Sequence, residues 1–281
     1  MSERVCKFGP NRALVGIYTE ASKEQTDRPT VLLFNAGLLH RVGQNRLNVS
    51  LAREVAAQGF PAFRFDFSGL GDSASQASEV SVRERQVAEM SAAMDFLEHF
   101  RGASQFVLVG LCTGADNAHR AAVSDKRVSG IVMLDGYSFV TLKYIVRRFR
   151  NKLLKLTHMR NFVVSQYRRI TRSNRAGDDG AKDGGATFFW ELPKKKRVIA
   201  ELRDLTNRGV RQLQVFSGSH QLYNYEGQYR AALNAVDFKD QLTVMYLSKA
   251  DHTLSMRSDR EPLIGDICDW LNDGFPTTLD H

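Results

Sequence analysis

Short runs of apolar residues alternate along the chain with longer segments in which apolar residues recur every three or four positions. The runs predict strands, and the periodic segments predict amphipathic helices. Predicted strands cover residues 13–19, 31–37, 61–67, 106–111, 128–134, 213–216 and 242–247, and predicted helices cover 45–58, 82–100, 197–207 and 264–271. The first strand is expected to be antiparallel. This alternation is typical of an α/β protein with a mostly parallel sheet covered on both faces.

Residues 138–200 interrupt this alternation. YIVRRFRNKLLKL and NFVVSQYRRI predict two basic amphipathic helices, whereas SNRAGDDGAKDGGA has the composition of a loop. An insert of this length is more typical of a lid than of a structureless connection. The sequence therefore predicts a core formed by residues 1–137 and 201–281 and a helical cap formed by residues 138–200.

The positive charge of the chain is concentrated in the same insert. The 281 residues carry a formal net charge of +8. Residues 138–200 contain 16 lysines and arginines against four acidic residues, which leaves 23 basic and 27 acidic residues elsewhere. This asymmetry indicates an anionic partner for the insert. An anionic membrane surface, contacted through residues 143–172, fits the pattern, whereas no nucleic-acid-binding motif is present and such a partner is not expected.

Composition bounds the setting in which the protein works. No apolar run approaches the roughly 20 residues that span a bilayer, and the polar start MSERVCKFGPNR lacks the core of a secretory signal. The three cysteines are widely spaced and form no metal-ligand pattern. We therefore expect a cytoplasmic protein, or one peripheral to the inner face of the membrane, without disulfide, metal or cofactor.

Gly110-Leu111-Cys112-Thr113-Gly114 is the most informative motif. It follows an apolar strand and precedes a helical segment, as in a nucleophile elbow. That turn is so tight that the residues two before and two after the nucleophile need to be nearly free of side chains. The sequence predicts Cys112 as a nucleophile at a helix N-terminus, where backbone dipoles favour a thiolate.

Four landmarks in order resemble the α/β-hydrolase superfamily. They are Asn35-Ala36-Gly37 after a strand, RFDFSGLGDS at 64–73, the elbow at Cys112 and a late Asp251-His252. The resemblance covers nearly the whole chain outside the insert and implies the α/β-hydrolase fold, a mostly parallel doubly wound sheet with a helical cap insertion. In having cysteine in place of serine at the elbow, the chain resembles dienelactone hydrolases and certain thioesterases.

The resemblance implies His252 as the general base. The acid that orients its imidazole usually follows the strand that ends VFSG here, but Ser219, His220 and Gln221 come next. Some members carry the acid one strand earlier, where Asp135 stands. Glu226 is the alternative, and a dyad without an acid also stays open.

The resemblance to the α/β-hydrolase superfamily also implies an oxyanion hole. Its donors are expected to be the backbone N–H of Thr113 and one N–H near Gly37 or Leu38. Candidate substrate-binding residues follow on two loops: His40, Arg41, Arg46, Tyr223, Asn224, Tyr225 and Gln228. The arginines would hold a carboxylate or phosphate, although a solvated loop explains them equally well. Aromatic packing is likewise an alternative for the tyrosines.

Together these features predict an acyl hydrolase or acyltransferase. It would act on an ester or thioester through an acyl-cysteine intermediate, on a substrate with an anionic portion such as acyl-CoA, an acyl group on an acidic carrier protein, or a phosphorylated lipid. Carboxylesterase, thioesterase and acyltransferase are not separated by the sequence. The empty acid position supports an alternative, a catalytically retired hydrolase-fold binding protein, and the basic insert supports a peripheral membrane-binding protein.

Overall fold

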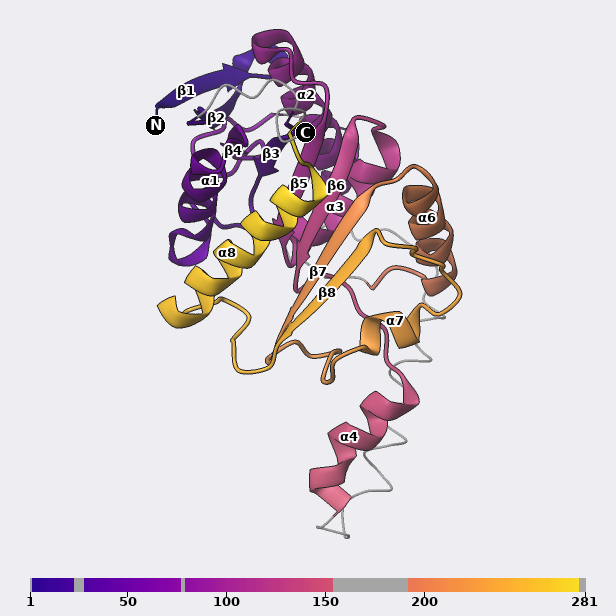
Figure 1. The fold of residues 1–281 in the computed structure, drawn as a ribbon. Helices are drawn as coiled ribbons and strands as arrows, with labels where there is room; N and C mark the ends of the chain where they lie inside the picture. Colours follow the sequence, from indigo (N-terminus) through magenta and orange to yellow (C-terminus); the bar gives the residue numbers. More distant parts are fainter. Residues whose placement is uncertain (1, 23–27, 77–78, 154–191, 278–281) are drawn as a thin grey trace.

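A single sheet of eight strands forms the centre of the computed structural model (Figure 1), which describes residues 2–22, 28–76, 79–153 and 192–277. The strand order is β1-β2-β4-β3-β5-β6-β7-β8. β2 pairs antiparallel with β1 and β4, and every other pairing is parallel. The strands are β1 (Glu3–Phe8), β2 (Leu14–Thr19), β3 (Thr30–Leu33), β4 (Ala62–Phe65), β5 (Phe106–Leu111), β6 (Val128–Leu134), β7 (Arg211–Ser217) and β8 (Leu242–Leu247).

Helices cover both faces of the sheet, because its central strands are apolar on both sides. In β3, Leu32 belongs to one apolar cluster while Val31 and Leu33 belong to the other. The first cluster includes residues of α2, α3 and α6, and the second includes residues of α1 and α8. The helices are α1 (Leu47–Ala57), α2 (Val82–Arg101), α3 (Thr113–Ser124), α4 (Leu142–Leu153), α6 (Lys195–Asn207), α7 (Gln228–Ala232) and α8 (Arg257–Gly274). This arrangement brings the carboxyl ends of the parallel strands to one edge, where sites of open α/β sheets form.

The predicted order of strands and helices is confirmed, but the prediction missed β1 and the short helix α7, which begins at the predicted loop residue Gln228, and misplaced several element ends. The sequence prediction missed β1, because ERVCKF looks like a charged leader. Its side chains nevertheless alternate, with Cys6 and Phe8 buried and Val5 66% exposed. The predicted strand at 31–37 is too long: β3 ends at Leu33, and the residues after it form the loop that approaches the elbow.

Part of the predicted cap lies within the described residues. α4 extends away from the sheet (Figure 1). α6 packs Val198, Leu202 and Leu205 into the core, so the predicted boundary at residue 201 falls inside this helix. The second predicted basic helix and the Gly/Asp-rich stretch lie outside the described residues, as does most of the 143–172 membrane-contact region, and the cap stays a prediction.

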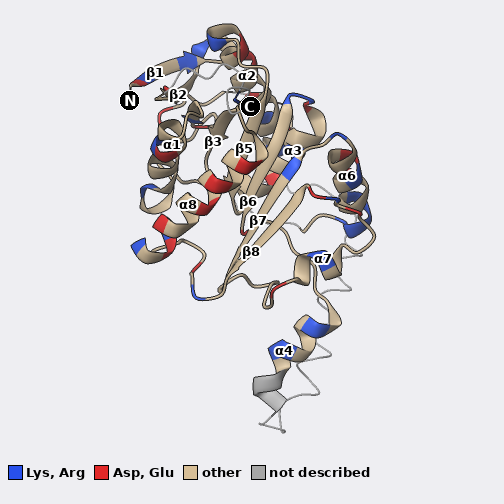
Figure 2. Ribbon diagram, in the orientation of Figure 1, with Lys and Arg blue, Asp and Glu red and all other residues tan. Residues whose placement is uncertain are grey.

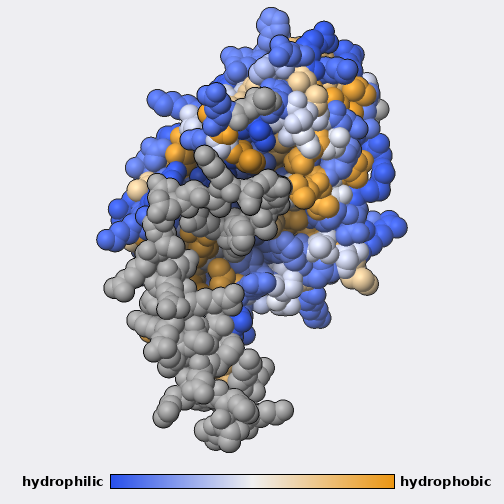
Figure 3. Space-filling model, turned by 180° about the vertical axis from the view of Figure 1, so that it is seen from behind, coloured by the Kyte–Doolittle hydropathy of each residue, from blue (hydrophilic) through white to orange (hydrophobic). Residues whose placement is uncertain are grey.

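Charge is distributed unevenly over the described surface. α4 carries lysines and arginines and no acidic residue, whereas α8 carries several acidic residues (Figure 2). On the opposite face, apolar side chains gather near the middle of the described surface and hydrophilic ones surround them (Figure 3). Among the described residues, no helix combines the length and the apolar character needed to cross a bilayer.

Candidate active site

The connection between β5 and α3 consists of one residue, Cys112. Its backbone lies at φ 54° and ψ −118°, a conformation that costs a non-glycine residue about 1–3 kcal/mol. A Cβ on Gly110 would lie 2.2 Å from the carbonyl oxygen of Gly114, and a Cβ on Gly114 would lie 3.0 Å from that of Asn35. Only glycines fit at the first position, so the spacing read from the sequence has a steric cause.

Cys112 is held from both sides of the turn. Its N–H donates to the carbonyl of Leu134 (2.8 Å), which continues the pairing of β5 with β6. Its carbonyl accepts from the N–H of Ala115 (3.0 Å) and so starts α3. The side chain is partly exposed, in contrast to the buried Cys6 and Cys268. The backbone of the strained residue is thus fixed, while the residue as a whole stays partly exposed.

His252 lies on the loop between β8 and α8. The preceding residue, Asp251, fixes this loop: its carboxylate accepts from the N–H of Thr253 (2.7 Å) and from the N–H of Ser255 (3.2 Å). Hydrogen bonds from Ser255 and then Thr253 lower the pKa of Asp251 to about 2. Asp251 therefore fixes the loop, and a different carboxylate contacts the imidazole of His252.

That carboxylate is Asp135, which follows β6. Its Oδ2 lies 2.8 Å from Nδ1 of His252. Ser217, at the end of β7, donates its N–H to Oδ1 (2.6 Å) and its hydroxyl to Oδ2 (2.6 Å), and the N–H of Asp135 donates to the carbonyl of Val215 (2.8 Å). The side chain is buried at 4% exposure. Ser217 was not among the residues predicted from the sequence, although its place beside the vacant acid position was a usable signal.

The environment of His252 favours its charged form. The hydrogen bond with Asp135, followed by interaction with the Cys112 side chain, raises the pKa of His252 to about 10, against the opposing effect of burial. Because Nδ1 faces Asp135, Nε2 is the nitrogen left for the sulfur. At neutral pH the imidazole of His252 is therefore protonated, between the carboxyl group of Asp135 and the sulfur of Cys112.

The alternative acid is elsewhere. Glu226 is exposed, and none of the hydrogen bonds and ion pairs recorded for the described residues uses its carboxylate. The structure brings Cys112, His252 and Asp135 together and leaves Glu226 apart.

The loop after β3 meets the elbow through a hydrogen bond. The N–H of Gly37 donates to Oγ1 of Thr113 (2.8 Å), so this amide is already used. Within the described part of the chain, no recorded hydrogen bond uses the N–H of Leu38 or of Thr113. Of the three residues predicted for an oxyanion hole, Thr113 and Leu38 therefore have available donors, and Gly37 links their two loops.

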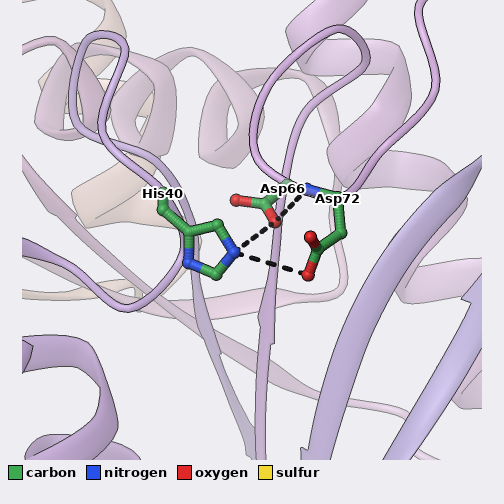
Figure 4. Close-up of side chains that lie close together, drawn as sticks. All are labelled: His40, Asp66 and Asp72. Atoms are coloured by element: carbon green, nitrogen blue, oxygen red, sulfur yellow. Dashed lines mark hydrogen bonds and ion pairs between the residues drawn. The ribbon is translucent and has the colours of Figure 1, made fainter.

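The predicted anion-binding arginines have other surroundings. The Arg41 guanidinium is buried, bonds the Asp66 carboxylate and lies 2.6 Å from Oδ2 of Asp72. Nε2 of His40 lies 3.5 Å from both carboxylates (Figure 4). His40, Asp66 and Asp72 have potential metal-ligand atoms within 4.8 Å of one another, but the guanidinium of Arg41 occupies the cationic position between the carboxylates. Arg46 is exposed where α1 begins.

Three of the four predicted pocket residues after β7 connect this loop to α4 or to the segment leading into it, whereas Tyr223 packs on β7. Tyr223 stacks on Phe216 with ring centroids 3.9 Å apart. The remaining contacts are Tyr225 Oη to Thr141 Oγ1 (2.8 Å), Asn224 Nδ2 to the Tyr144 carbonyl (3.1 Å) and Gln228 Nε2 to the Phe139 carbonyl (3.1 Å). Tyr223, Tyr225 and Gln228 are buried. Their contacts support packing of the α4 base.

Known proteins resemble this chain in fold but not in sequence. No family model matches the chain, and no curated protein matches its sequence. Solved structures match over nearly its whole length. Est1E from Butyrivibrio proteoclasticus has a TM-score of 0.61 at 10% identity, covering 96% of this chain and 98% of that one. The esterase domain of a Rhodothermus marinus protein has a TM-score of 0.58 at 18% identity, covering 97% and 99%. An alpha-beta serine hydrolase homologue from Coxiella burnetii has a TM-score of 0.55 at 14% identity, covering 96% and 95%.

The chain has the α/β-hydrolase fold. The predicted fold class is thereby confirmed. At these identities the likeness concerns the fold alone, so the chemistry has to be argued from the residues of this chain.

Proposed function

We propose that this protein is an acyl hydrolase or acyltransferase that acts on an ester or thioester through an acyl-Cys112 intermediate. The observation that carries the proposal is the position of His252. Its Nδ1 is held 2.8 Å from a buried carboxylate, and its pKa is raised to about 10 by Asp135 and Cys112. A charged imidazole beside a partly exposed thiol stabilises the thiolate, which is the nucleophilic form of cysteine.

Acylation follows from this arrangement. The Cys112 thiolate attacks the carbonyl carbon, and the carbonyl electrons move to the oxygen, where the N–H groups of Leu38 and Thr113 stabilise the negative charge. The carbonyl then re-forms as the bond to the alcohol or thiol breaks. The imidazolium of His252 gives its Nε2 proton to this leaving group, and the acyl group remains on the sulfur.

Deacylation regenerates the same state. Neutral His252 accepts a proton from water or an acceptor alcohol as its oxygen attacks the acyl-cysteine. The tetrahedral intermediate expels the Cys112 thiolate and releases an acid or a new ester. Asp135 keeps the ring oriented and balances its charge in both half-reactions. A retired binding protein would have no need to preserve this linked set.

Intact mass spectrometry tests the intermediate. The protein is incubated with p-nitrophenyl esters and acyl thioesters of increasing length, quenched in acid and weighed. We expect an added mass equal to the acyl group, mapped to Cys112 and absent from Cys112→Ala, with product release in the unquenched reaction. Cys268→Ala, which removes a buried thiol, is the matched control. If no acyl donor gives either an adduct or a product, the proposal is contradicted and the retired binding protein is favoured.

The exposed face of α4 supports a second role, contact with an anionic membrane surface. Leu142 is 83% exposed and Val146 is 61% exposed, one helical turn apart, and Ile145 lies beside them. Lys143 and Arg147 are exposed on the same helix, which lacks acidic residues. Apolar residues flanked by cations are typical of helices that lie at a bilayer surface. This role is compatible with acyl transfer on a phosphorylated lipid.

Sedimentation with vesicles tests this role. We expect binding to vesicles that contain anionic lipid, weakening as salt increases and lost in Leu142→Asp/Val146→Asp. Vesicles of phosphatidylcholine alone should not bind. Equal sedimentation of wild-type protein and the double variant would contradict the proposed surface.

A further inference from the structure

A polar cavity lies along α3, apart from Cys112, His252 and Asp135. It encloses about 370 Å³ between α3, the end of α2 that begins at Val82, and the segment that enters α6. Four cationic and two acidic side chains contribute to its wall: Arg83, Arg120, Lys194, Arg197, Asp116 and Glu201.

The cavity begins one helical turn from the nucleophile. The N–H of Asp116 approaches the carbonyl of Cys112 (3.4 Å), and Arg120 follows one turn later on the same side of α3. At 1.5 Å per residue, Arg120 is about 12 Å along the helix axis from Cys112. Tyr137, two residues after the catalytic carboxylate, also lines the cavity. A substrate with its carbonyl at Cys112 would need an extended arm to reach Arg120.

One cation and one acid of the wall neutralise each other. Glu201 accepts from Nε of Arg197 (2.6 Å) and lies 3.0 Å from Nε2 of His119. Although burial opposes the shift, these contacts lower the pKa of Glu201 to about 2. The opposite ring nitrogen of His119 lies 3.2 Å from the Tyr137 hydroxyl. This chain of contacts joins α6 to α3 and fixes that side of the cavity.

Arg120 and Lys194 make no such direct contact with an acidic side chain. In the described part of the chain, no recorded hydrogen bond or ion pair uses the guanidinium of Arg120 or the ammonium of Lys194. Burial, and next the charges of Arg83 and Arg197, lower the pKa of Arg120, against the smaller opposing effects of Asp116 and Glu201. Like charges held together in a partly buried cavity favour an anion with several oxygen atoms.

We propose that this cavity binds a phosphate or pyrophosphate group on the carrier portion of the acyl substrate, with Arg120 and Lys194 as its principal ligands. The assignment rests on the proposed acyl-transfer function and names its substrate class, a phosphorylated acyl carrier. Arg120 can donate two parallel hydrogen bonds to phosphate oxygens. Arg41, one of the residues that the sequence offered for anion binding, is buried against Asp66 and Asp72 instead.

Titration calorimetry with inorganic pyrophosphate tests the site without requiring turnover. We expect binding by the wild-type protein, weakened about ten-fold or more in Arg120→Gln, because the variant loses charge-assisted hydrogen bonds to the phosphate oxygens. Lys194→Gln, at an exposed position, should weaken binding in the same direction without a risk to folding. Arg257→Gln is the matched control, since its side chain is 80% exposed on α8. Equal affinity in all four proteins, or no binding by the wild type, would overturn the assignment.

Kinetics separate this assignment from the proposed function. The ratio of kcat/KM for an acyl-CoA to that for a neutral p-nitrophenyl ester should fall about ten-fold or more in Arg120→Gln and remain at the wild-type value in Arg257→Gln. A ratio that does not fall in Arg120→Gln overturns the carrier site while leaving acyl transfer intact. Pyrophosphate binding without turnover of any acyl donor would reject the proposed function and restrict the inference to phosphate binding.

Discussion

Two clusters at the carboxyl edge of the sheet contain the same kinds of residue in different arrangements. One, after β3 and β4, contains His40, Arg41, Asp66 and Asp72. The other, after β5, β6 and β8, contains Cys112, Asp135 and His252. Each places a histidine beside an aspartate. The clusters differ in what the remaining polar atoms contact.

The Asp66 cluster closes on itself. Oδ1 of Asp66 accepts from the Asn35 side chain (2.7 Å) and the Arg41 N–H (2.6 Å), and Oδ2 accepts from the Arg41 guanidinium and the Asp72 N–H (3.2 Å). A Cβ at Gly71 would lie 2.3 Å from this carboxylate. Every oxygen is therefore used to fix two loops. This explains the SGLGDS turn in structural terms.

In the Asp135 cluster the carboxylate has all its partners within the protein, whereas Cys112 at the other end is partly exposed. Ser217 holds the carboxylate, but the ring it orients points to a partly exposed sulfur. A fully satisfied polar network stabilises a unique structure, whereas chemistry requires one member that can still exchange a proton with a ligand. The contrast predicts that equivalent substitutions affect stability in one cluster and rate in the other.

Asp135→Asn should have the largest effect, on rate. The amide cannot balance the imidazolium and favours the wrong ring tautomer, so we expect kcat/KM to fall about a thousand-fold while the melting temperature changes little. Ester hydrolysis and thermal unfolding measure the two quantities. A fall of less than about ten-fold would show that Cys112 and His252 act as a dyad.

Asp66→Asn should chiefly change stability. It leaves the buried Arg41 guanidinium without its main counter-charge, which we expect to lower the free energy of unfolding by about 3–5 kcal/mol. Urea unfolding measures this loss. Asp72→Asn is the matched control: its carboxylate is 59% exposed, so its removal should cost about 1 kcal/mol or less. Similar losses of unfolding free energy in both variants would contradict the view that Asp66, and not Asp72, is the main counter-charge of Arg41.

Ser217→Ala should reduce rate moderately. It removes the hydroxyl that donates to Oδ2 of Asp135, and we expect kcat/KM to fall about ten-fold, the equivalent of about 1.4 kcal/mol. Ser217→Thr retains the hydroxyl and should restore most of the rate. Ser219→Ala serves as control, because Ser219 contacts the Ser217 hydroxyl (3.2 Å) and not the carboxylate. Equal kcat/KM values for Ser217→Ala and the wild-type protein would exclude Ser217 as a positioning residue.

The smallest expected effect is the pH dependence of stability. The pKa of His252 is raised from 6.5 to about 10 in the folded protein. Its contribution to stability is therefore fully present below pH 6.5 and lost as the pH rises through 10. The side chain is 45% exposed, so solvent screening should keep the contribution to about 1 kcal/mol. Urea unfolding of wild-type and His252→Gln proteins at pH 6, 8 and 10 should show their difference shrinking; a constant difference would contradict the shift.

Local sequence patterns predicted the elements and the elbow, because those depend on neighbours within a few residues. Gly110 and Gly114 could be recognised from spacing alone, and the apolar runs located the central strands. β1 escaped prediction because Cys6 and Phe8 are buried only by elements distant in the sequence: β1 pairs with β2, and the ring of Phe8 packs on aromatic rings of β4 and α2. Arg41 could not be assigned because its counter-charges, Asp66 and Asp72, are 25 and 31 residues away.

The sequence by itself therefore determined the α/β-hydrolase fold and proposed Cys112 and His252, in that order, as reactive groups. Only the tertiary structure decided which carboxylate faces the imidazole. β6 lies between β5 and β7 in the sheet, so Asp135 reaches both the His252 loop and the Ser217 donors, while Glu226 lies on an exposed turn. The physical reason is that strand adjacency, not distance along the chain, brings charges within hydrogen-bonding range.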